Sequence, residues 1–178
     1  MMPVVIPVVG GKKSGKTATI ELLVKELARR GYRVAVAKHI PEPNFTIDTR
    51  GKDTWRFAEA GAKTIVAVSP SEVAVIEKVQ TGNFSVDDIL RPCSNSAIVF
   101  LEGFRRLIAA EKHLQKIAVV KSASDAREAV KTFERILAFT GSYNTERDYP
   151  AIPYVDVSRE PNKLADIIEL TVKKGVVT

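Results

Sequence analysis

The chain has 178 residues, of which 45% are hydrophobic and 27% charged, and this balance excludes disordered and fibrous proteins. The net charge of +6 suits binding of polyphosphate or an acidic partner, but the basic residues are scattered and not interleaved with aromatic side chains, so we expect no nucleic-acid partner. The single cysteine and the lack of a long apolar segment favour a cytoplasmic protein without membrane contact, with one domain over residues 1–178.

The first predicted elements are a strand and a helix. The apolar run VVIPVVG predicts a buried strand, and apolar residues then recur at helical spacing until Gly31 supplies a stop. This stripe consists of Ile20, Leu23, Val24, Leu27 and Ala28. The strand and the helix are joined directly by the octapeptide GGKKSGKT.

The middle of the chain continues the alternation. YRVAVAKH predicts a strand, positions 40–52 a surface loop, and DTWRFAEAGA a short helix ended by Gly61. KTIVAVSP predicts another strand, and only Ser-Pro-Ser separates it from the β-rich EVAVIEKV, which we expect to form an antiparallel hairpin or an edge strand.

The rest of the chain contains two nearly continuous apolar runs, SAIVFLEG and KIAVVKS, as parallel strands covered on both faces require. SDAREAVKTFERI predicts a helix with Ser124 as its N-cap, and ILAFTGS and PYVDVS are candidates for the last strands. A final helix is predicted from Pro161 to Gly175. The sequence therefore predicts a three-layer α/β fold, with a mostly parallel twisted sheet and helices on both faces.

The octapeptide matches the phosphate-binding pattern G-x-x-x-x-G-K-[ST] at Gly10, Gly15, Lys16 and Thr17, between a predicted strand and a predicted helix, so we expect the α/β fold to be of the P-loop NTPase type. In such loops backbone N–H groups and the helix N-terminus surround an anion, the lysine reaches the β- and γ-phosphates, and the hydroxyl can ligate Mg²⁺. The alternative is a basic turn, and solvated loop lysines are the simpler interpretation of Lys12 and Lys13. The predicted nucleotide-binding residues are Gly10, Gly11, Lys12, Lys13, Ser14, Gly15, Lys16, Thr17 and Ala18.

A phosphate loop usually works with an acidic residue at the end of a second buried strand, which holds the magnesium shell. Glu102 ends SAIVFLEG, and Gly103 after it allows a close backbone approach. Asp53 is a second candidate, for which helix capping and a role in magnesium binding or water positioning are equally good explanations. We thus predict Lys16, Asp53 and Glu102 as catalytic residues and Thr17, Asp53 and Glu102 as metal ligands.

Four motifs together resemble the molybdopterin-guanine dinucleotide biosynthesis protein B (MobB) family. They are the N-terminal phosphate loop, a strand ending in Lys38-His39, the segment DTRGKDTWRFAEAGA from Asp48 to Ala62, and LEGFR ending at Arg105. Their order and spacing agree over about the first 105 residues. The last two motifs are much more specific than the phosphate loop, and we expect both at one edge of the sheet.

The resemblance implies a homodimeric GTP-binding protein with weak GTPase activity and Mg²⁺ as cofactor. Its partner would be the guanylyltransferase that joins GMP to molybdopterin, with molybdopterin itself as a further ligand. Two alternatives remain from the residues alone: a small-molecule or nucleoside kinase that uses ATP, and a nucleotide-gated adaptor that does not hydrolyse its nucleotide. In the kinase, EGFRRLIAAEKHLQK would be the arginine-bearing lid.

Overall fold

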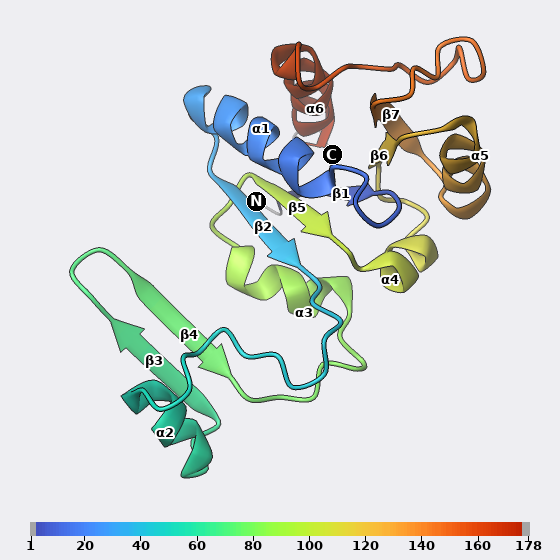
Figure 1. The fold of residues 1–178 in the computed structure, drawn as a ribbon. Coiled ribbons are helices and arrows are strands. Elements are labelled where there is room, and N and C mark those ends of the chain that lie inside the picture. Colours follow the sequence, from blue (N-terminus) through green and yellow to red (C-terminus); the bar gives the residue numbers. More distant parts are fainter. Residues whose placement is uncertain (1–2, 176–178) are drawn as a thin grey trace. The chain divides into compact units, whose positions relative to one another are not determined.

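The computed structural model describes residues 3–175, which fall into two compact units (Figure 1). One unit contains the described residues up to His39 and those from Ser85 onward, and the other is Ile40–Phe84. The expected single domain over residues 1–178 stays a prediction. No helix in the described part of the chain has the length and apolar character needed to cross a membrane.

Strands and helices alternate along most of the chain, as the sequence predicts. In chain order the elements are β1 (Val4–Val9), α1 (Lys16–Arg29), β2 (Val34–Lys38), α2 (Asp53–Glu59), β3 (Thr64–Val68), β4 (Val73–Glu77), α3 (Val86–Leu90), a 3₁₀ turn (Arg91–Cys93), β5 (Ile98–Glu102), α4 (Arg105–Ala110), β6 (Lys116–Val120), α5 (Ala123–Thr132), β7 (Ile136–Gly141) and α6 (Pro161–Gly175).

The first unit is built on a five-stranded sheet in the order β2-β5-β1-β6-β7. All four neighbouring pairs are parallel, so the carboxyl ends of the five strands lie at one edge. β1 is central and pairs with β5 on one side and β6 on the other. The predicted α/β class is confirmed.

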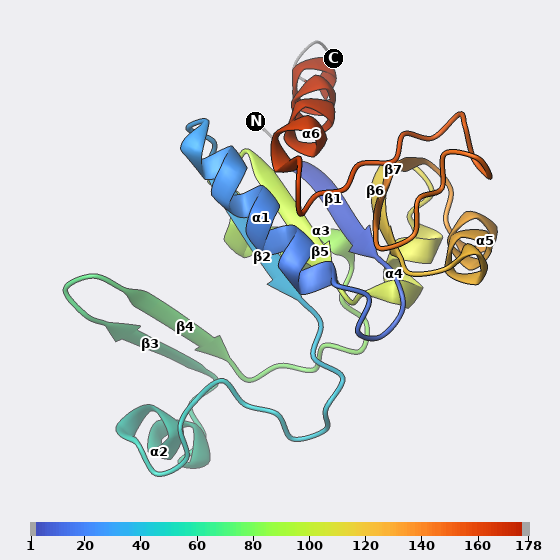
Figure 2. The same ribbon diagram turned by 45° about the horizontal axis from the view of Figure 1, so that its top comes forward.

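Helices cover both faces of this sheet (Figures 1 and 2). The side chains of Ile98 and Phe100 on β5 pack in a core shared with α1 and α6, whereas Val99 and Leu101 pack in a core shared with α4 and α5. This alternation follows from the two-residue period of a strand. The continuous apolar runs therefore bury every side chain of β5.

The second unit consists of α2 and the antiparallel hairpin of β3 and β4, which confirms the predicted hairpin. Ile65 is buried, as one face of β3 contacts α2. The opposite face carries four exposed valines, and these face each other across the two strands as the pairs Val66↔Val75 and Val68↔Val73.

Two details of α5 differ from the sequence prediction. The N-cap is Ser122 rather than Ser124, because the Ser122 side chain accepts the amide of Asp125 at 3.2 Å and the helix begins at Ala123. The helix also ends at Thr132, because Phe133 is already extended and buried. The predicted helical segment to Ile136 was therefore too long.

The predicted strand PYVDVS is also wrong. Only an isolated bridge joins Tyr154 to Phe139, supported by hydrogen bonds from the Phe139 amide to Pro153 O and from the Val155 amide to Phe139 O. Asp156 then turns the chain, as its carboxylate accepts the amide and hydroxyl of Ser158. Local turn chemistry thus ends the pairing after one bridge.

α1 and α6 are linked by an arginine. The Arg30 guanidinium lies 2.7 Å from Glu26 on α1 and 2.6 Å from Asp166 on α6, and it also donates to the backbone carbonyl of Asn162 at 3.0 Å. Its side chain is 16% exposed, whereas that of neighbouring Arg29 is 70% exposed and contacts only Glu26 among these groups. Arg30 therefore ties the end of α1 to α6.

Arg30→Ala should lower the thermal unfolding midpoint by about 3–8 °C, because several charge-assisted hydrogen bonds between two helices are lost. Arg29→Ala is the matched control, and we expect a shift below about 2 °C because exposed ion pairs contribute little. The measurement is thermal unfolding followed by circular dichroism. Equal shifts for the two variants would show that the link between α1 and α6 is not stabilising.

Candidate phosphate and magnesium site

The loop from Gly10 to Thr17 follows the carboxyl end of β1, in the centre of the sheet. Gly10 and Gly15 have positive φ angles, 151° and 99°, which only glycine adopts readily. A Cβ atom on Gly10 would lie 2.4 Å from the backbone oxygen of Val119 on β6 and 2.7 Å from Ser14 Oγ. The loop is thus packed against the neighbouring strand.

Lys16 lies over this loop. Its Nζ donates to the carbonyl oxygens of Gly10 at 3.1 Å and Gly11 at 2.7 Å. Burial lowers the pKa of the Lys16 ammonium, the Glu102 carboxylate opposes that shift, and the charges of Lys38 and Lys121 add to it. An anion bound here would gain from three positive charges and would relieve their mutual repulsion.

The amino end of α1 offers further donors. The first N–H groups of a helix lack partners within it. In α1 the helical bonding begins with the Thr19 amide, which donates to Gly15 O at 2.9 Å, so the amides before Thr19 are the ones that point to the loop. The Ser14 hydroxyl is buried, and no group within residues 3–175 hydrogen-bonds to it. A buried polar atom without a partner is costly, so the loop fits a phosphate that would bond to it.

Thr17 and Glu102 meet at the same edge. The Thr17 hydroxyl donates to the two carboxylate oxygens of Glu102 at 2.9 and 3.1 Å, although the residues are 85 positions apart. Glu102 is 8% exposed, and Lys38 Nζ lies 3.5 Å from it. Their positions follow from the parallel register, which pairs Glu102 with Val8 of β1 and Lys38 of β2.

A hydroxyl beside a carboxylate is a donor set suited to Mg²⁺, which prefers oxygen ligands and keeps several waters. Within the described residues no group of three or more His, Cys, Asp or Glu side chains could hold a metal ion. A magnesium ion at Thr17 and Glu102 would therefore take its other ligands from phosphate and water. The residues present fit this arrangement.

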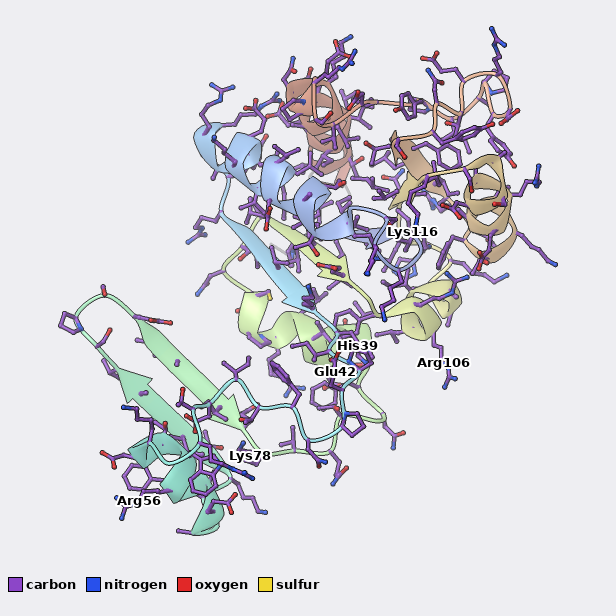
Figure 3. The ribbon with its side chains drawn as sticks, in the orientation of Figure 1. His39, Glu42, Arg56, Lys78, Arg106 and Lys116 are labelled. Atoms are coloured by element: carbon purple, nitrogen blue, oxygen red, sulfur yellow. The ribbon has the colours of Figure 1, made fainter. Side chains whose placement is uncertain are left out.

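Asp53 is placed differently from the other predicted site residues. It is the first residue of α2, which belongs to the second unit. The N-cap of α2 is Lys52, so the interpretation of Asp53 as the helix cap was wrong. Its side chain is 82% exposed and lies 3.5 Å from that of Arg56, which extends away from α2 (Figure 3). The catalytic and metal roles of Asp53 stay predictions, as does the meeting of GKDTWRFAEAGA and LEGFR at one edge.

Two further lysines, for which the sequence predicted no role, lie at this edge. Lys38 of β2 is paired in register with Glu102 on the neighbouring strand β5, and Lys121 follows β6 and donates to the backbone oxygen of Lys12 at 3.4 Å. The available signal was that both directly end or follow a predicted strand. Lys12 and Lys13 have exposed side chains, in keeping with their interpretation as solvated lysines.

Similarity to known proteins identifies the family of the chain. The model of the family "Molybdopterin guanine dinucleotide synthesis protein B", or MobB, matches residues 5–142. The chain belongs to the MobB family. The match includes the phosphate loop, the second unit and the strand that ends at Glu102.

Curated relatives agree with this assignment. A molybdopterin-guanine dinucleotide biosynthesis adapter protein of Haemophilus influenzae is 29% identical over 91% of this chain and 85% of its own length. A putative adapter protein of the same name from Methanocaldococcus jannaschii is 30% identical over 80% of this chain, which spans 57% of that relative.

Solved structures agree as well. A crystal structure of molybdopterin-guanine biosynthesis protein B has a TM-score of 0.72 and 28% identity, and the match covers 95% of this chain and 99% of that one. Bacillus subtilis MobB, at 21% identity and a TM-score of 0.71 over 94% and 96% of the two chains, shares the fold. The MobB fold thus extends over nearly the whole chain.

Gly10→Ala should lower the free energy of unfolding by about 2 kcal/mol or more, because the added methyl group overlaps Val119 O in a conformation that alanine disfavours. Gly11→Ala is the matched control, since a Cβ there meets nothing within 4 Å, and we expect a change below about 0.5 kcal/mol. Denaturant unfolding measures both. Similar values for the two variants would contradict the packing of the loop against β6.

Proposed function

We propose that this MobB protein binds GTP with Mg²⁺, hydrolyses it slowly, and acts in the cytoplasm as an adapter to the guanylyltransferase that attaches GMP to molybdopterin. The observation that carries the proposal is the phosphate loop with Lys16 above it and the Thr17–Glu102 pair beside it. The adapter role is supported by the name of the Haemophilus influenzae relative.

Each residue has a specific task in this proposal. Backbone N–H groups from Gly11 to Ala18 bind the phosphates, and Lys16 exchanges its loop carbonyls for the β- and γ-phosphate oxygens. Thr17 and Glu102 hold the magnesium ion, which neutralises phosphate charge when bound. Asp53 remains the proposed residue for the attacking water or the magnesium shell.

Catalysis in such a site depends on positioning and electrostatics, without a covalent intermediate. GTP hydrolysis breaks the bond between the γ-phosphorus and the bridging oxygen, as the oxygen of a water molecule attacks in line. GDP and inorganic phosphate are the products. Molybdopterin is proposed as a ligand of the complex formed with the guanylyltransferase.

The kinase alternative needs an arginine-bearing lid, for which the segment containing α4 is the candidate. Ile108 of α4 is 1% exposed and belongs to the core between the sheet and α5. A helix with a buried anchor in the main core is poorly suited to opening over the phosphates. The third hypothesis, a nucleotide-gated adaptor, differs from our proposal only in releasing no phosphate.

Lys16→Ala should weaken binding of GTP in the presence of Mg²⁺ by at least about tenfold, because its ammonium provides the central positive charge of the loop. Lys25→Ala, on the exposed side of α1, is the control for the loss of one lysine and should bind like the wild type. Isothermal titration calorimetry gives the affinities, with circular dichroism as a check that each variant is folded.

Equal affinity of Lys16→Ala and the wild type would contradict the assigned phosphate site. Tighter binding of ATP than GTP, together with phosphorylation of an acceptor in a screen of nucleosides and sugars, would favour the kinase. The same titration repeated with the guanylyltransferase tests the adapter role, for which we expect the partner to change the affinity for GTP.

We further propose that two copies of the chain associate through the exposed face of the β3–β4 hairpin. The valine pairs Val66↔Val75 and Val68↔Val73 form a contiguous apolar patch, and both edges of this two-stranded sheet are unpaired within the described residues. A patch that is apolar throughout can contact its own copy, as a two-fold interface requires. The homodimer implied by the family resemblance thus has a candidate interface.

Val68→Lys should convert the dimer to a monomer, because a lysine at this 74% exposed position would place two like charges in the apolar contact. Val130→Lys, at an exposed valine of α5, is the control and should stay dimeric. Light scattering after size exclusion gives the masses. A monomeric wild type, or a Val68→Lys variant that stays dimeric, would refute this interface.

A further inference from the structure

A small cavity of about 30 Å³ lies next to the phosphate loop, on the face of the sheet that α4 and α5 cover. It is lined by the end of β1, the phosphate loop, the turn after β5, α4 and the residue that directly follows α5, and Gly10, Lys16, Arg105, Ile108 and Phe133 are among these lining residues. Among the described residues, Arg105 is the one arginine that borders this cavity, together with Gly10 and Lys16 of the phosphate loop.

The turn between β5 and α4 places Arg105 close to this edge. Gly103 has a φ of 94°, and a Cβ atom there would lie 3.2 Å from the Cβ and backbone oxygen of His39. The Arg105 amide donates to Gly103 O at 2.6 Å, so α4 begins three residues after Glu102. The strand that ends in the candidate magnesium ligand is thus followed three residues later by an arginine.

The Arg105 guanidinium contacts side chains of α5 and of the residue that follows it. Its Nη2 lies 2.6 Å from Glu128 and 3.5 Å from the Thr132 hydroxyl, and its Cζ lies 5.4 Å from the centre of the Phe133 ring. Both partners of the ion pair are about half exposed or more, at 49% for Arg105 and 63% for Glu128. Exposed pairs of this kind are weak, so the arginine can change partners.

We propose that Arg105 is a catalytic arginine supplied in cis, whose guanidinium gives up its bond to Glu128 and contacts the γ-phosphate of GTP instead. This inference rests on the proposed GTPase function and adds a residue to it. When water oxygen bonds to the γ-phosphorus, the electron pair of the breaking bond goes to the bridging oxygen of GDP. The proton of the water ends on the released phosphate or in solvent, and Arg105 stabilises the negative charge on the transferred group.

The physical reason for the exchange is charge. A phosphate chain carries more negative charge than one carboxylate, and arginine bonds to phosphate through two parallel N–H groups. The bond to Glu128 has to be given up first, which slows turnover of the isolated protein. Arg106 extends outward from α4 and does not border the cavity (Figure 3), so it provides a neighbouring arginine without this position.

The test compares Arg105→Ala, Glu128→Gln and the control Arg106→Ala in single-turnover GTP hydrolysis with Mg²⁺ and excess protein. Arg105→Ala should lose at least about tenfold in rate with GTP affinity within about threefold of the wild type, because the contact forms mainly in the transition state. Glu128→Gln should raise the rate about twofold or more, and Arg106→Ala should match the wild type.

Unchanged rates in both Arg105→Ala and Glu128→Gln, with GTP still bound, would overturn the inference and leave the proposed GTP binding intact. A wild type that binds no GTP would instead refute the proposed function itself. Unfolding midpoints separate a catalytic effect from a structural one, since a merely structural Arg105–Glu128 pair predicts that both variants lose stability and neither gains rate. Glu128→Gln, which retains the arginine, also tests the inference where Arg105→Ala does not fold.

Discussion

The position of β1 between β5 and β6, parallel to both, is the constraint on which the site depends. Parallel strands end at one edge, so the loop after β1, the carboxylate at the end of β5 and the lysine after β6 come together there. Gly10 lets the loop pass against Val119 without a side chain in between. A hydrogen bond between residues 85 positions apart, from Thr17 to Glu102, follows from this pairing.

The charges at this edge are unequal, and that imbalance suits an anion. Lys16, Lys38, Lys121 and Arg105 supply positive charge, whereas Glu102 is the carboxylate that contacts Thr17 and Lys38. Lys16 donates its hydrogen bonds to loop carbonyls, and Arg105 forms an ion pair with Glu128. Both cations thus have weak substitute partners that a polyphosphate can replace, which reduces the cost of desolvating them on binding.

The second unit contains a motif that is specific for the family but does not belong to the parallel sheet. The segment GKDTWRFAEAGA is one of the most specific motifs of the chain, yet it lies outside the parallel sheet, in a unit of α2 and one hairpin. Apolar β-branched residues on both faces of this hairpin predicted strands correctly. They did not reveal that four valines would stay exposed, because burial depends on what covers a face and not on the strand itself.

The sequence by itself determined the features that depend on neighbours in the chain: the phosphate loop, the helix that follows it, the alternation of strands and helices, and the family. Its errors were also local, since Ser122 and Ser124 are both good helix caps and a short apolar run such as PYVDVS does not specify a partner. Only the tertiary structure decided which strand ends meet, and so brought Lys38 and Thr17 to Glu102 and Arg105 to Glu128. Strand order and register arise from packing between distant segments, which periodicity within one segment does not encode.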